Sequence, residues 1–101
     1  MTATPKAHES ITPGEILLTE FLQPLGITQY RLAQATGLSQ TRISEIVRGK
    51  RTITTETGLR LSRALGVDDR FWINVQTDYN LEVERDLHQP EIDKVTCLVT
   101  S

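Results

Sequence analysis

Apolar residues between positions 29 and 49 recur at intervals of mostly three and four, the spacing that lines one face of a helix. Polar and small residues interrupt this run near its middle, so the pattern predicts two short helices with a turn between them. We place the helices at 29–36 and 40–48. The apolar positions that would face a shared core are Leu32, Ala33, Leu38, Ile43, Ile46 and Val47.

The residues around the junction of these two helices favour a tight turn. Ala33 is small, as a position must be where two helices cross closely, and Gly37 suits a left-handed backbone conformation. Thr28 can cap the first of the two helices and Ser39 the second, and Gly49 is placed to end the second. A small residue, a turn glycine and a capped second helix at this spacing are typical of a helix-turn-helix.

A capping box opens another predicted helix, at 13–22. Thr12 is its N-cap, Pro13 takes the first helical position, and Glu15 can reach back to the cap. Residues 24–26, which include a proline and a glycine, are expected to close it. Its inward face would be formed by Ile16, Leu17, Phe21 and Leu22.

Two more helices are predicted at 54–65 and 69–85. Thr54 caps the first of them, and the acidic pair Asp68-Asp69 suits the positive end of the second. The expected core positions are Leu59, Leu61, Ala64 and Leu65 in one helix, and Phe71, Trp72, Val75 and Tyr79 in the other. We expect Trp72 to anchor the core, because a small domain needs its large apolar side chains inside.

Both ends of the chain differ from this helical pattern. Residues 1–11 are polar and predict a flexible N-terminal arm. The tail at 87–101 contains a β-branched, alternating stretch at 94–100 that could form a strand, which must pair with something or stay disordered. It could add a strand to another chain's sheet, pair with its copy in a homodimer, or have no role. The fold class is therefore all-α: a five-helix domain at 12–86 with a short C-terminal extension.

Charge is distributed unevenly along the chain. The net charge is −2, yet residues 28–63 hold seven basic residues and only two acidic ones. The remainder holds four basic and eleven acidic residues. Because salt screens charges beyond about 10 Å, the local excess matters more than the total. A basic helix-turn-helix on an acidic body indicates a protein that binds nucleic acid.

The helix at 40–48 carries the candidate base-reading residues, because the N-terminal turn of this helix enters the major groove deepest in the motif. Glutamine can pair with adenine, arginine with guanine, and a threonine methyl can contact thymine. Glu45 could accept from a cytosine amine, or could orient Arg42 or Arg48. The predicted base-reading residues are Gln40, Thr41, Arg42, Ser44 and Glu45.

A second group is predicted to contact DNA phosphates. Gln29 and Ser39 stand at helix N-termini, where donors suit a phosphate, and Arg48, Lys50 and Arg51 follow the reading helix. Such contacts set affinity and salt dependence rather than sequence choice. Since one reading helix covers only a few base pairs, we expect a homodimer on double-stranded DNA, at an inverted repeat with half-sites about one helical turn apart.

The sequence gives little support to an enzyme, a cofactor or a metal site. It contains no nucleophile–base arrangement and no phosphate-binding glycine loop, and its two histidines lie near opposite ends. The single Cys97 excludes an intrachain disulfide, and we expect it to be packed in its apolar run. A polar N-terminus and the lack of an apolar run of about 18 residues predict a cytoplasmic protein without a membrane partner.

Several motifs together resemble the HigA/VapI group of antitoxins in the Xre, lambda-repressor-like, helix-turn-helix family. The motifs, over about residues 12–84, are PGE, PLG, RISEIVRGKR, TGLRLSRALG and FWINVQTDY. The resemblance implies a five-helix lambda-repressor-like domain that represses its own operon as a dimer. It also implies neutralisation of HigB, a small RelE-like toxin that cleaves messenger RNA on the ribosome. A stand-alone repressor with the same domain and no toxin stays open as the alternative.

Overall fold

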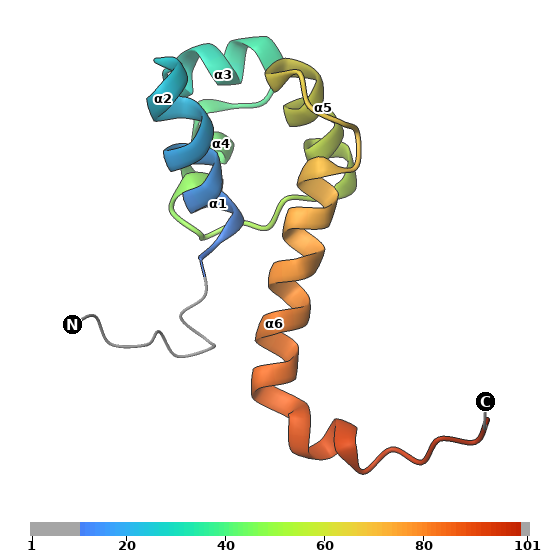
Figure 1. The fold of residues 1–101 in the computed structure, drawn as a ribbon. Coiled ribbons are helices and arrows are strands. Elements are labelled where there is room, and N and C mark those ends of the chain that lie inside the picture. The colour runs from blue at the N-terminus through green and yellow to red at the C-terminus, as the bar shows by residue number, and fades with distance from the viewer. Residues whose placement is uncertain (1–10, 100–101) are drawn as a thin grey trace.

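The computed structural model describes residues 11–99 as a helical body from which one long helix projects (Figure 1). The predicted arm, apart from Ile11, and the last residue of the predicted strand lie outside the described residues. The first three elements follow one another without a break and form one continuous helix. Residues 11–99 therefore contain five helices, as the sequence predicts. The elements are α1 (Pro13–Ile16), the π-helical η2 (Leu17–Leu22), α2 (Gln23–Leu25), α3 (Gln29–Thr36), α4 (Gln40–Val47), α5 (Thr55–Leu65) and α6 (Phe71–Asp93).

All four helix starts that the sequence predicts to be capped by a side chain are capped. Thr12 and Glu15 form the reciprocal capping box, with the Glu15 N–H 3.1 Å from Thr12 Oγ1 and the Thr12 N–H 3.4 Å from Glu15 Oε1. Each cap satisfies a backbone donor that the first helical turn leaves without a partner. The other caps are Thr28 accepting from the Arg31 N–H at 3.0 Å, Ser39 from Arg42 at 3.0 Å and Thr54 from Thr57 at 3.2 Å.

The first helix runs through Pro24 to Leu25, three residues beyond the predicted end near residue 22, although the predicted closing glycine is where it stops. In η2 the backbone widens, and the Gln23 N–H bonds to the Leu18 carbonyl, five residues earlier. Proline has no N–H to donate, and its ring would press on a carbonyl of a regular helix. The π-helical segment loosens the backbone just before Pro24, which is how the helix continues past it. Gly26, at a φ of 64°, then ends the helix.

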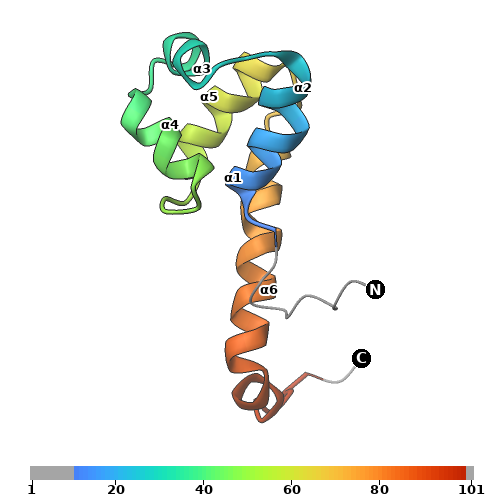
Figure 2. The same ribbon diagram turned by 90° about the vertical axis from the view of Figure 1, so that its left-hand side faces the viewer.

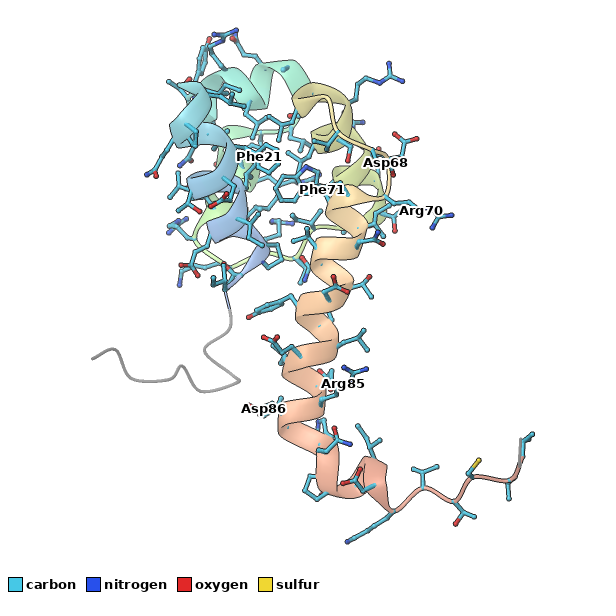
Figure 3. All side chains as sticks on the ribbon, viewed as in Figure 1. Phe21, Asp68, Arg70, Phe71, Arg85 and Asp86 are labelled. Atoms are coloured by element: carbon cyan, nitrogen blue, oxygen red, sulfur yellow. The ribbon has the colours of Figure 1, made fainter. Side chains whose placement is uncertain are left out.

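The core lies where the helices of the body meet, and the buried Trp72 packs there against the half-buried Phe21 and Phe71. Phe21 and Phe71 point toward one another from the first helix and α6 (Figure 3), with ring centroids 5.6 Å apart. Trp72 contacts both rings and is fully buried, as predicted. The remaining buried apolar residues are Leu17, Leu22, Leu32, Ala33, Leu38, Ile43, Ile46, Ile53 and Leu61.

Leu59, expected in the core, is 41% exposed. Small residues lie on the packed face of α5 in its place: Ser62, and Gly58, where an added Cβ would lie 3.3 Å from Ile73 Cγ1 and 3.5 Å from Trp72 Cβ of α6. Helices that approach this closely leave no room for a large side chain at the contact. The prediction was wrong because it followed hydrophobicity alone and gave no weight to the small residues.

α6 is 23 residues long, or about 35 Å, and its C-terminal half projects from the body (Figures 1 and 2). It begins at Phe71 rather than 69, because the Asp68 carboxylate accepts from the Arg70 N–H at 2.8 Å and forms a separate turn. It ends at Asp93 rather than 85. Pro90 lies three residues before the last residue of the helix, so little of the helix follows the position that lacks a backbone donor. The domain boundary predicted at residue 86 therefore falls inside a helix.

No strand forms among the described residues of the tail. Residues 96–99 have no regular secondary structure, and Cys97 is exposed rather than packed. The segment follows the projecting end of α6, away from the core (Figure 1). A strand needs a neighbouring strand to satisfy its backbone, so the predicted strand at 94–100 stays a prediction that depends on a second chain.

Candidate nucleic-acid interface

α3 and α4 form the predicted helix-turn-helix, and α4 lies at the outer edge of the body (Figure 2). Gly37 makes the turn with a φ of 76°. The Thr36 hydroxyl donates to the Leu32 carbonyl at 2.8 Å and accepts from the Leu38 N–H at 3.3 Å, so it bridges the end of α3 and the turn. These contacts fix the angle at which α4 leaves α3.

The predicted base-reading residues lie outside the face of α4 that packs on the body. Ile43 and Ile46 are buried, which fixes the rotation of the helix about its axis. Gln40 and Thr41 are exposed in the first turn, while Arg42, Ser44 and Glu45 are half-buried beside it. The arrangement offers amide, hydroxyl and guanidinium groups of the kind that read base edges in the major groove.

The predicted phosphate contacts lie at the two ends of this surface. Gln29 begins α3, and Ser39 caps α4, so each stands at a helix N-terminus. At the other end is the basic loop, residues 48–53, where Lys50 and Arg51 are exposed. Arg48 bonds back to the Ser44 carbonyl through its Nε at 3.3 Å, which satisfies one of the last carbonyls of α4.

Glu45 pairs with Arg51, a partner that the sequence did not suggest. Its Oε1 lies 2.8 Å from the Arg51 Nε, and its carbonyl accepts from the Lys50 N–H, also at 2.8 Å. The expectation that Glu45 could orient Arg42 or Arg48 is therefore not what the structure shows. The loop folds back over the end of α4, and only this reversal brings residues six apart within reach.

The N-terminus of α1 packs directly against the C-terminal turn of α4. A Cβ atom on Gly14 would overlap the carbonyl oxygen of Ile46, so the two backbones are in direct contact and no other residue fits there without a shift. Beside this contact, a pocket of about 130 Å³ separates the basic loop from the start of α1 and from Gln76 and Tyr79 of α6. The basic loop is thus only partly packed on the body.

Two side chains that sequence reasoning missed fix this surface from a distance. Arg60, predicted only as one charge of the basic segment, donates through Nη1 to the Thr36 carbonyl at 2.8 Å and holds the turn of the motif. Gln76 accepts through Oε1 from the Ile53 N–H at 2.8 Å and holds the end of the basic loop. No local pattern could have identified either pair, because the partners are 24 and 23 residues apart.

The helix pair, its turn and its exposed polar face define a helix-turn-helix protein. A family model described as "Helix-turn-helix" matches residues 18–72. Virulence-associated protein I of Dichelobacter nodosus is 49% identical over 74 residues, which span 73% of this chain and 68% of that protein. Antitoxin HigA-1 of Vibrio cholerae is 35% identical over 91 residues, 90% of this chain and 86% of that one.

A solved structure of the Pseudomonas aeruginosa antitoxin HigA with the higBA promoter also has this fold. It superposes with a TM-score of 0.81 at 33% identity, over 88% of this chain and 98% of that one. The chain belongs to the Xre-like helix-turn-helix family, in the group that contains the HigA and VapI proteins. This is a family of DNA-binding proteins rather than a class of enzymes.

Neither a metal site nor a membrane span is found in the part of the chain that the structure describes. Residues 11–99 contain no group of three or more histidine, cysteine or acidic residues arranged to hold a metal ion. No helix within this range is both long and apolar enough to cross a membrane.

Proposed function

We propose that this protein is a repressor that binds an operator in its own promoter as a homodimer. The observation that carries this proposal is the face of α4, where buried Ile43 and Ile46 leave Gln40, Thr41 and Arg42 at the accessible end. The Pseudomonas aeruginosa HigA that shares the fold is described in complex with a promoter. An inverted repeat with half-sites about one helical turn apart would match a two-fold dimer.

In this proposal the polar residues of α3, α4 and the basic loop have two roles. Gln40, Thr41, Arg42, Ser44 and Glu45 read bases, with Glu45 also holding Arg51 at the edge of the groove. The phosphate contacts come from Gln29, Ser39, Arg48, Lys50 and Arg51. Ser39 keeps its hydroxyl hydrogen available to a phosphate, because its oxygen is the acceptor in the helix cap.

Two substitutions test these roles against each other. Arg42→Ala should weaken operator binding by about 1–3 kcal/mol and relax the preference at one base position, since it removes a base contact. Lys50→Ala should weaken binding to all duplexes alike and reduce the salt slope by about one, since it removes a phosphate contact. Fluorescence anisotropy on the promoter and on a scrambled duplex, at several salt concentrations, measures both. Unchanged binding in two folded variants would mean that α4 is not the reader.

We further propose that the repressor is the antitoxin of a type II toxin–antitoxin module. Its partner would be a HigB/RelE-like toxin that cleaves messenger RNA. The support is similarity: a relative named as antitoxin HigA-1 covers 90% of this chain, and a solved antitoxin HigA covers 88%. The helix-turn-helix by itself does not require such a partner, so this part of the proposal depends on the relatives alone.

A co-expression experiment tests the antitoxin role. The small reading frame next to the gene is induced alone and together with this protein, while growth and translation are followed. We expect growth arrest that this chain relieves, with the two proteins eluting together in size-exclusion chromatography. Absence of toxicity and of a complex would favour the alternative, a stand-alone repressor without a toxin.

A further inference from the structure

Gln76 lies on α6 behind the interface, and it is the long-range side-chain contact of the basic loop. Its side chain is buried, with 7% of the residue exposed. Oε1 accepts from the Ile53 N–H at 2.8 Å, and Nε2 donates to Asn80 Oδ1 at 2.9 Å. Both ends of the amide are therefore used, which fixes its orientation.

The basic loop needs such a contact because its two ends are held differently. The α4 end is fixed locally: the Gly49 N–H bonds to the Ile46 carbonyl at 3.0 Å, and the Lys50 N–H to the Glu45 carbonyl at 2.8 Å. The α5 end reaches the body through Ile53, which is 4% exposed and carries the buried N–H. An unsatisfied buried N–H is costly, so the Gln76 acceptor favours this position of the loop over others.

Packing alone would not fix the middle of the loop. The pocket of about 130 Å³ lies between Lys50, Arg51 and Thr52 on one side and α1 and α6 on the other. A loop that borders an open pocket lacks the close contacts that hold a side chain or backbone in one place. Glu45 holds the Lys50 backbone and the Arg51 side chain from the α4 end, and the hydrogen bond at Ile53 restrains the loop at its other end.

We infer that Gln76 is a positioning residue for DNA binding, which holds the basic loop so that Lys50 and Arg51 reach the phosphate backbone together. The inference rests on the proposed DNA-binding function. Gln76 lies behind the loop and acts through it, so it sets affinity for any duplex and leaves base preference unchanged. Preorganisation of this kind avoids the entropy that a free loop would lose on binding.

The test uses the full-length protein with Gln76→Met, which keeps the length of the side chain and removes the amide acceptor. Phe21→Leu is the matched control, because it disturbs the core on the side of the first helix and leaves the loop contacts in place. Amide exchange at Ile53 is measured by NMR, and binding to the promoter duplex and to a scrambled duplex is measured across salt concentrations.

We expect Gln76→Met to speed exchange at Ile53 at least tenfold. The salt slope should fall by about one to two, and binding at 0.1 M salt should weaken about tenfold for each phosphate that the loop no longer reaches. Both duplexes should weaken alike, and Phe21→Leu should keep the wild-type slope even where it lowers Tm. Gln76→Glu keeps an acceptor for Ile53 and should retain the slope on both duplexes better than Gln76→Met does.

Two results would overturn the inference. One is fast exchange at Ile53 in Gln76→Met with an unchanged salt slope, which would mean that the loop does not need this bond. The other is an equal reduction of the slope in Phe21→Leu, which would make the effect one of general stability. If the wild-type protein prefers no operator, the proposed repressor function fails, whereas the slope on the scrambled duplex still tests Gln76.

Discussion

The two halves of α6 are stabilised in different ways, although they form one continuous helix. In the first half Trp72 and Gln76 are buried, and their partners come from the first helix and from the loop before α5. In the second half Leu87 and Ile92 are exposed, and Figure 3 shows Arg85 and Asp86 on the part that projects from the body. Local hydrogen bonds occur there, such as the one from Gln89 to Asp93 at 2.8 Å.

The first half of α6 stabilises the fold, whereas the second half mainly exposes its surface to solvent. Burial of large apolar side chains contributes most of the stability of a small domain, whereas exposed pairs one helical turn apart contribute little. The first half of α6 therefore belongs to the core that positions α4 and the basic loop. The second half contributes little to the stability of that core. Together with the tail, it is the candidate contact region for the proposed homodimer.

The largest expected effect comes from breaking the buried half. Trp72→Ala should lower the free energy of unfolding by about 3–5 kcal/mol, because it leaves a cavity among Phe21 and Phe71. The matched change in the projecting half is Leu87→Ala, at a side chain that is 60% exposed. It should stay within about 0.5 kcal/mol of wild type. Urea unfolding followed by circular dichroism measures both, and similar destabilisation by the two changes would contradict the division of α6.

A smaller effect is expected from a long-range polar contact in the body. Arg60→Met should cost about 1–2 kcal/mol, because it removes a charged donor from the Thr36 carbonyl at the turn. Arg63→Met, also on α5 and exposed, is the control and should change stability little. Thermal unfolding gives the comparison. Equal destabilisation in the two variants would show that the Arg60 bond does not support the turn.

The smallest effect is expected from a local pair in the projecting half. Glu84 lies 3.6 Å from His88, one turn along α6, and both side chains are more than half exposed. Glu84→Gln should change the free energy of unfolding by less than about 0.5 kcal/mol, since solvent screens such a pair. Denaturant unfolding at pH 7 is the measurement. A decrease of more than about 1 kcal/mol would mean that the projecting half is coupled to the core.

The four helix starts that carry a side-chain cap were predictable because their causes are local. Thr12, Thr28, Ser39 and Thr54 each cap the backbone three residues further on, and no distant residue is needed. The same holds for Gly37, whose left-handed conformation follows from the turn that it must make. The extent of α6 was not predictable in this way. The residues after 85 favour a helix and contain no clear stop signal before Pro90. The sequence alone does not show how far the helix continues past this proline.

In the candidate site, too, the local features could be predicted from the sequence and the long-range contacts could not. The residues on α4 could be named in advance, because the buried isoleucines fix which side of a helix faces out. The contacts that shape the basic loop could not, because Glu45 reaches Arg51 only after the chain reverses, and Gln76 reaches Ile53 only after α6 packs on the body. The exposure of Leu59 was also not predictable from the sequence, since it depends on how closely α5 and α6 approach.

By itself, the sequence determined that this protein is an all-α helix-turn-helix domain, with a basic segment at residues 28–63 on an otherwise acidic chain. Periodicity, caps and turn glycines act over three or four residues, so they are written directly in the order of the residues. Only the tertiary structure decided which arginine supports the turn, which carboxylate holds Arg51 and which amide holds Ile53. Arg60 and Gln76 reach partners 24 and 23 residues away only because the helices pack together. Glu45 reaches Arg51 only because the loop folds back over the end of α4.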